Sequence, residues 1–153
     1  MNPLYQRDSF LIRPVVEEDV PAVVHLEQSL YSTPWSEQSF RFELTHERSR
    51  FWVFESAGLL AGYQVGWIIV NSYHLHNLAI APHAQGQGLA AEVLDFMCQY
   101  LARLALSCIE LEVRAANVRA LALYRKAGFK IVGIRRRYYR QPFEDAILMQ
   151  NLI

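Results

Sequence analysis

A glycine-rich turn between a strand-like segment and a long amphipathic helix is the feature that most constrains this chain. Residues 78–80 are apolar and strand-like, and Gln85–Gly88 form the turn that follows them. From Leu89 to Leu104, apolar residues recur at helical spacing. Glycines let successive amide groups point into one concavity, and a helix N-terminus carries roughly half a positive charge. The segment is therefore predicted to bind phosphate oxygens.

Two familiar phosphate-binding motifs do not describe this turn. The sequence contains no G-x-x-x-x-G-K-[ST] pattern, so the turn is not a P-loop. It also contains no G-x-G-x-x-G dinucleotide fingerprint. A glycine pair before a helix can also be purely structural, so the turn alone does not identify the ligand.

Length and composition favour one domain, residues 1–153, with a core that needs no disulfide or metal. The 153 residues carry 15 basic and 15 acidic side chains, which argues against a nucleic-acid coat or a polybasic membrane anchor. Cys98 and Cys108 are too few for a disulfide framework, which favours a reducing cytoplasm. We expect no signal peptide and no membrane span, since the longest apolar run, Val65–Val70, has only the length of a strand.

Hydrophobic periodicity predicts an α+β fold with a mixed, mostly antiparallel sheet of about seven strands flanked by helices. Asp19 and Ser36 are candidate helix caps, Asn117 is a third, and Gly128 is a candidate helix C-terminus. One strand–helix–strand unit, residues 75–113, is expected to form a parallel strand pair. The expected strands are residues 10–14, 51–54, 59–70, 75–80, 108–113, 130–134 and 144–152.

Several motifs along nearly the whole chain together resemble one known family. Gln85-x-x-Gly88-x-Ala90 is similar to the pyrophosphate loop of the GNAT superfamily of acetyltransferases. The runs Leu111–Asn117 and Ala122–Phe129 resemble further motifs of that family. Pro34–Ser36, Arg136–Tyr139 and Glu144–Met149 are most similar to the RimI-type subfamily.

The resemblance implies a GNAT fold, in which a splayed parallel strand pair holds acetyl-CoA as co-substrate. It also implies acetylation of the N-terminal alanine of a small-subunit ribosomal protein. The backbone amides of Leu78, Ala79 and Ile80 are implied to pair with the pantetheine arm. The pyrophosphate set is Gln85, Gly86, Gln87, Gly88, Leu89, Ala90 and Ala91, and Asn117 is implied to contact the pantetheine or the thioester.

The family implies Glu112 as general base and Tyr124 as general acid in a direct transfer from thioester to amine. An α-amine has a pKa of about 7.7–8.0, so near neutral pH it is mostly protonated, and a carboxylate can take its proton directly or through water. The alternatives are that Glu112 is an ordinary solvent-facing residue of an alternating strand and that Tyr124 is a core aromatic.

Trp35, Tyr138 and Tyr139 are candidates for the acceptor cleft, and each could equally be a packing residue. The histidines form no ligand set, so no metal is expected. Residues 114–140 hold nine of the 15 basic side chains, which fits either a solvated surface or a polyanionic ligand. No direct nucleic-acid binding is expected. Another amine acceptor, or a non-catalytic coenzyme A binding module, stays open as an alternative function.

Overall fold

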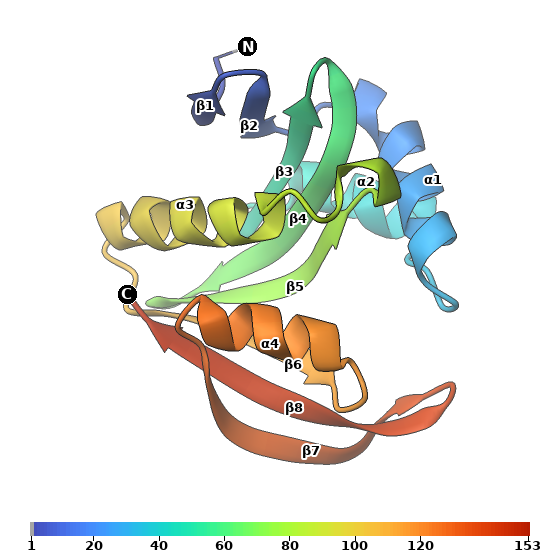
Figure 1. Cartoon of the computed structure of the whole chain (residues 1–153), viewed down its shortest axis with the longest axis vertical. Coiled ribbons are helices and arrows are strands. Elements are labelled where there is room, and N and C mark those ends of the chain that lie inside the picture. The colour runs from blue at the N-terminus through green and yellow to red at the C-terminus, as the bar shows by residue number, and fades with distance from the viewer. Residues whose placement is uncertain (1) are drawn as a thin grey trace. The chain divides into compact units, whose positions relative to one another are not determined.

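Eight strands and four α-helices follow one another along residues 2–153, the part of the chain that the computed structural model describes (Figure 1). The α+β class and the mainly antiparallel pairing predicted from the sequence are confirmed. The short strand β1 was not predicted, because three residues are too few to show an alternating pattern. The elements are β1 (Tyr5–Arg7), β2 (Phe10–Pro14), α1 (Val20–Leu30), α2 (Glu37–Thr45), β3 (Ser49–Ser56), β4 (Leu59–Ile69), β5 (Ser72–Ile80), α3 (Leu89–Arg103), β6 (Cys108–Arg114), α4 (Val118–Lys126), β7 (Lys130–Arg140) and β8 (Phe143–Leu152), with 3-10 turns at Glu17–Asp19 and Pro82–Ala84.

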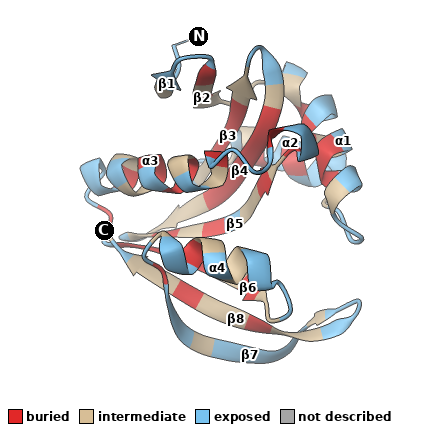
Figure 2. Cartoon of the chain, in the orientation of Figure 1, coloured by how far each residue is buried: buried red, intermediate tan, exposed pale blue. Residues whose placement is uncertain are grey.

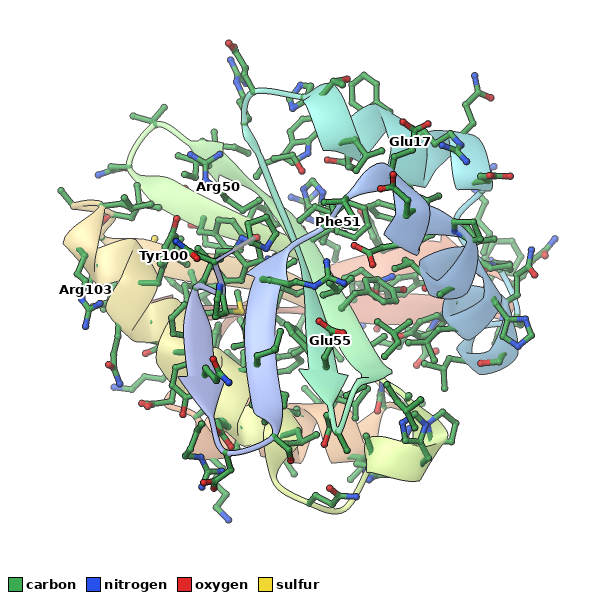
Figure 3. All side chains as sticks on the ribbon, turned by 90° about the horizontal axis from the view of Figure 1, so that it is seen from above. Glu17, Arg50, Phe51, Glu55, Tyr100 and Arg103 are labelled. Atoms are coloured by element: carbon green, nitrogen blue, oxygen red, sulfur yellow. The ribbon has the colours of Figure 1, made fainter. Side chains whose placement is uncertain are left out.

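The chain divides into two compact units, of which the first contains the residues up to Ile68 together with Asn77–Leu89. Its strands β1, β2, β3 and β4 pair antiparallel in that order. Leu11 of β2 lies opposite Glu55 of β3, which Figure 3 labels. The turn between β3 and β4 places Ala57 and Gly58 at positive φ, as a two-residue type I′ hairpin turn requires.

Helices α1 and α2 supply the apolar core of the first unit together with β3 and β4. The core contains Val23 from α1, Phe40 from α2 and Phe51 from β3, and the buried positions are red in Figure 2. The predicted cap at Ser36 is confirmed, since its hydroxyl accepts the Ser39 amide at 3.1 Å.

The N-terminal end of α1 differs from the prediction in one respect. Asp19 occupies the N-cap position, but its side chain makes no cap hydrogen bond to the helix. Its carboxylate instead accepts two hydrogen bonds from Arg13 and one from the Val16 amide. The arginine competes successfully because a charged, bidentate pair is stronger than a neutral cap.

The second unit contains Ile69–His76 and Ala90–Ile153. Its strands lie in the order β5, β6, β8, β7. The predicted parallel pair is confirmed: Ser72 lies opposite Cys108, and the ladder continues to Leu75 opposite Leu111. Strand β7 is exposed along most of its length and lies next to β8 only, at one end of the strand order (Figures 1 and 2).

Across residues 2–153, every helix is too short or too polar to span a lipid bilayer.

Candidate active site

The predicted phosphate-binding turn leaves β5 through a 3-10 turn and leads directly into α3. Gly86 and Gly88 both have φ +76°, a left-handed conformation that is costly for residues with a Cβ. The Gln85 side chain donates a hydrogen bond to the Ile80 carbonyl at 3.0 Å, which fixes the start of the turn. The first amides of any α-helix have no partner within the helix, so the start of α3 is suited to an anionic ligand.

The residues expected to pair with the pantetheine arm occupy the last part of β5. Ala79 is buried, and Leu78 and Ile80 are partly exposed. The Ala81 amide donates to the Ala61 carbonyl of β4 at 2.8 Å. A Cβ at Gly62 of β4 would collide with the Ala79 carbonyl oxygen, so only glycine permits this close approach.

Glu112 is not a freely exposed residue of an alternating strand. Its side chain is only 15% exposed, and its Oε2 lies 2.9 Å from the Nε2 of His74. The parallel pairing of β5 with β6 brings this histidine to the carboxylate, since His74 lies opposite Glu110 in the register. A carboxylate held in this way can accept a proton at a defined position.

Tyr139 lies within the electrostatic reach of the same carboxylate. Burial, and next the charge of Glu112, raise the pKa of the Tyr139 phenol to about 12. The Arg114 guanidinium stacks over the Tyr139 ring at 4.1 Å and also lies 3.4 Å from Glu144. Tyr138 contacts the Tyr139 ring edge to face but is half exposed. The structure therefore brings Tyr139 to the Glu112 region and leaves Tyr138 on the surface.

Tyr124 and Asn117 both belong to α4 or its start. Asn117 is the predicted N-cap, and its Oδ1 accepts the Ala120 amide at 3.1 Å. Tyr124 is buried, with its ring against the edge of Phe129 at 5.5 Å between centroids. Gly128 ends the helix at φ +101°, as predicted. Tyr124 therefore packs against Phe129 through its ring. This packing is compatible with a chemical role for its hydroxyl.

Trp35 lies between α1 and α2 in the first unit. Its indole packs against Phe40, with 5.4 Å between ring centroids, and it lines a hollow of about 520 Å³ next to Ser39 and Phe42. Its backbone amide donates to the Glu27 carboxylate at 2.9 Å. Glu27, which the sequence did not single out, is 1% exposed.

A second hollow, of about 590 Å³, lies between α3, α4 and the end of β8 in the second unit. Among the predicted site residues, only Ala91 lines it. Cys98 also lines this hollow and is partly exposed. Burial raises the pKa of the Cys98 thiol, which therefore stays protonated near neutral pH.

Within residues 2–153, the acidic, histidine and cysteine side chains form no group of three that could hold a metal ion. His74 and His76 lie with their ring centroids 5.3 Å apart.

Comparison with known proteins decides the family. The sequence model described as "Acetyltransferase (GNAT) family" matches residues 20–129. The chain belongs to the GNAT family. It is thus an acetyltransferase by family, and members of this family use acetyl-CoA.

The most informative similarities are to alanine N-acetyltransferases. The [ribosomal protein bS18]-alanine N-acetyltransferase of Escherichia coli K12 is 35% identical over 133 residues, 86% of this chain and 89% of the relative. N-alpha-acetyltransferase RimI of Mycobacterium tuberculosis is 34% identical over 139 residues, 87% of this chain and 86% of the relative. The resemblance to the RimI-type subfamily is thereby confirmed.

Solved structures agree with this assignment. The crystal structure of the ribosomal-protein-S18-alanine N-acetyltransferase from Escherichia coli superposes with a TM-score of 0.87 at 34% identity, covering 94% of each chain. A Vibrio cholerae spermidine N-acetyltransferase solved with CoA and spermine has a TM-score of 0.81 at 22% identity, covering 94% of this chain and 95% of the other. The second similarity shows the shared fold alone.

Two residues of the site region escaped the sequence reasoning. The histidines were considered only as metal ligands, and His74 lies just before the predicted strand 75–80, so its place opposite Glu110 became clear only from the strand register. Glu27 gave a weaker signal, because an acidic residue at the end of a helical apolar pattern usually faces solvent.

Proposed function

We propose that this chain transfers the acetyl group of acetyl-CoA to the N-terminal alanine of a small-subunit ribosomal protein. The observation that carries the proposal is the 35% identity to the Escherichia coli enzyme, which spans 89% of that relative. We further propose that residues 1–153 act as a single catalytic domain in the cytoplasm. The family match supports one domain, because residues 20–129 include parts of both compact units.

Acetyl-CoA is proposed to bind along Leu78–Ile80 and at the turn Gln85–Ala91. The left-handed glycines support this placement, since each leaves the backbone open where a side chain would otherwise stand. The open space around them supports it as well, because a Cβ built at Gly86 or Gly88 meets no atom within 4 Å, which leaves room for a ligand. Asn117 is proposed to contact the pantetheine or the thioester end.

Glu112 is proposed as general base and Tyr124 as general acid in a direct transfer within a ternary complex. The acceptor nitrogen bonds to the thioester carbonyl carbon, and the carbon–sulfur bond breaks. Glu112 takes the proton that the amine loses, and Tyr124 supplies a proton to the departing thiolate. The contact between Glu112 and His74 supports this role, because it fixes the orientation of the carboxylate.

The acceptor is proposed to meet Trp35, Tyr138 and Tyr139. Tyr139 has the strongest support of the three, since burial, and next the nearby charge of Glu112, raise the pKa of its phenol. We propose no direct contact with nucleic acid or with a membrane.

The test is to incubate the purified chain with acetyl-CoA and three peptides. One begins with a free alanine, the second has a blocked N-terminus and an internal lysine, and the third has a free N-terminus other than alanine. We expect acetylation of the first peptide only, read by mass spectrometry. Labelling of the internal lysine alone would instead favour a different acceptor, and binding of acetyl-CoA without turnover would favour a non-catalytic module.

A further inference from the structure

Glu27 is an almost fully buried ionisable residue of the first unit. It lies on α1 with 1% of its surface exposed, among the buried side chains of the first unit. Burying a carboxylate is costly unless hydrogen bonds replace the lost water. An apolar residue of similar volume often serves stability equally well or better. A carboxylate at this position therefore indicates a role beyond packing.

Three donors form hydrogen bonds with this carboxylate. Oε1 accepts from the Tyr63 hydroxyl and from the Asn77 side-chain amide, the latter at 2.9 Å, and Oε2 accepts from the Trp35 backbone amide at 2.9 Å. Asn77 also donates to the Tyr63 hydroxyl at 3.0 Å, which closes the network. Burial, and next the Glu27 contact, raise the pKa of Tyr63, so its phenol remains a donor.

The network joins two segments that have different proposed tasks. Trp35 belongs to the connection between α1 and α2, where the acceptor is proposed to bind. Asn77 directly precedes Leu78–Ile80, where the thioester arm is proposed to bind. One carboxylate contacts both segments, so two hydrogen bonds separate the Trp35 backbone from the Asn77 side chain.

A second contact joins the same two segments. The Tyr31 hydroxyl donates to the Leu78 carbonyl at 3.4 Å, a long hydrogen bond from a side chain that is 39% exposed. Burial of the hydroxyl, and next the Glu27 charge, raise the pKa of Tyr31 to about 12. The phenol therefore stays protonated and able to donate across the physiological range.

We infer that Glu27 is a positioning residue that fixes the acceptor segment at Trp35 relative to the acetyl-CoA strand at Asn77–Leu78. The inference rests on the proposed function and deepens it. Without the carboxylate, the Trp35 amide loses its hydrogen-bond acceptor and the affinity for the acceptor amine falls. The acetyl-CoA strand keeps its pairing with β4. Loss of Glu27 thus weakens acceptor binding and selection of the first residue, and it spares acetyl-CoA binding.

The test compares Glu27→Met with Tyr63→Phe in the full chain. Methionine keeps the approximate volume and removes both links. We expect about a tenfold higher KM for the alanine peptide, the scale of one lost hydrogen bond to a charged group. The Kd for acetyl-CoA, measured by calorimetry, should stay within about twofold, the precision of such comparisons. Tyr63→Phe removes one donor and leaves the Trp35 and Asn77 links, so its acceptor KM should stay near the wild-type value.

Hydrogen exchange at the Trp35 amide provides a direct readout of the link. We expect faster exchange in Glu27→Met and unchanged exchange in Tyr63→Phe. Should the methionine variant not fold, Glu27→Gln carries the same expectation at about threefold in KM, because a neutral amide oxygen is a weaker acceptor.

Three results would overturn the inference. The first is an unchanged acceptor KM in a folded Glu27 variant whose Trp35 amide exchanges faster. The second is a parallel rise of acceptor KM and acetyl-CoA Kd, which indicates general loosening, and the third is an equal effect of Tyr63→Phe. A wild-type chain that fails to acetylate the alanine peptide contradicts the proposed function instead, so the two failures are distinguishable.

Discussion

Replacing Glu112 by glutamine removes the proposed general base while it preserves the shape of the side chain. The carboxylate is 15% exposed and lies 2.9 Å from His74, and a glutamine can keep a polar contact there. The amide cannot accept the proton of the acceptor amine. We therefore expect kcat to fall by about 10²–10⁴-fold, the usual contribution of general acid–base catalysis. This corresponds to about 2.7–5.5 kcal/mol in the activation free energy.

The pH dependence of the rate provides a second test of this prediction. Below the acceptor pKa of about 7.7–8.0, the neutral fraction of the amine rises about tenfold per pH unit. A variant without a base depends on amine that is already neutral, so its deficit against the wild type should shrink as pH rises towards about 8.5, above the amine pKa. The assay is the initial rate of acetylation of the alanine peptide at saturating acetyl-CoA, across this pH range.

Glu110→Gln is the matched control for this experiment. Glu110 lies two residues earlier on β6, accepts a hydrogen bond from Gln150 at 3.2 Å and has no role in the proposed mechanism. Its loss should leave kcat within about threefold, since exchanges away from the reacting atoms rarely cost more than ~0.5 kcal/mol. A Glu112→Gln enzyme that is as fast as this control, with unchanged acetyl-CoA binding, would refute the reasoning.

Substitutions at four further positions test other features of the structure. His74→Ala should lower kcat by about tenfold, because an orienting hydrogen bond to a charged group is lost. His74→Gln should lower kcat by less. An unchanged kcat in both variants would contradict an orienting role. Tyr124→Phe should lower kcat by about 10²-fold and keep the ring contact with Phe129, so thermal unfolding should detect little change; undiminished turnover would remove the phenol from the mechanism. Gly88→Val should abolish acetyl-CoA binding in calorimetry. Gly58→Val, at a matching φ of +77°, should introduce a backbone strain of about 1–2 kcal/mol and still bind acetyl-CoA. Comparable heats of binding from both variants would contradict the proposal that the turn at Gly88 binds acetyl-CoA. Asp19→Asn should destabilise the fold by about 1–2 kcal/mol at pH 7, as measured by urea unfolding. Burial opposes ionisation of Asp19, but Arg13 and the Val16 amide outweigh it and lower the pKa of this carboxyl. The stabilisation is thus complete above the unfolded value of about 3.9 and is lost as pH falls through the folded pKa, so a difference that grows towards low pH would contradict it.

Local signals in the sequence were sufficient to predict much of the fold. Ser36 and Asn117 cap their helices as predicted, because a cap acts between residues only three positions apart. The helix end at Gly128 was also predicted from the sequence, since a left-handed helix end favours glycine. Asp19 departs from its prediction because Arg13, six positions away, forms a bidentate pair with it.

Contacts between segments that are distant in the sequence could not be predicted from the sequence alone. The Glu112–His74 contact depends on the register of two strands that are 38 positions apart in the sequence. The Glu27–Asn77 contact spans 50 positions, and nothing in the local pattern around Glu27 marks it as buried. The resemblance to the family implied catalytic roles for Glu112 and Tyr124, which stay predictions, and the structure added His74 as the hydrogen-bonding neighbour of Glu112.

The most direct test of the central claim is the mass of the alanine peptide after incubation with the purified chain and acetyl-CoA. The account predicts the addition of one acetyl group, located on the first residue by fragmentation. It also predicts that the blocked peptide with an internal lysine stays unmodified. An unmodified alanine peptide beside an acetylated internal lysine would contradict the account.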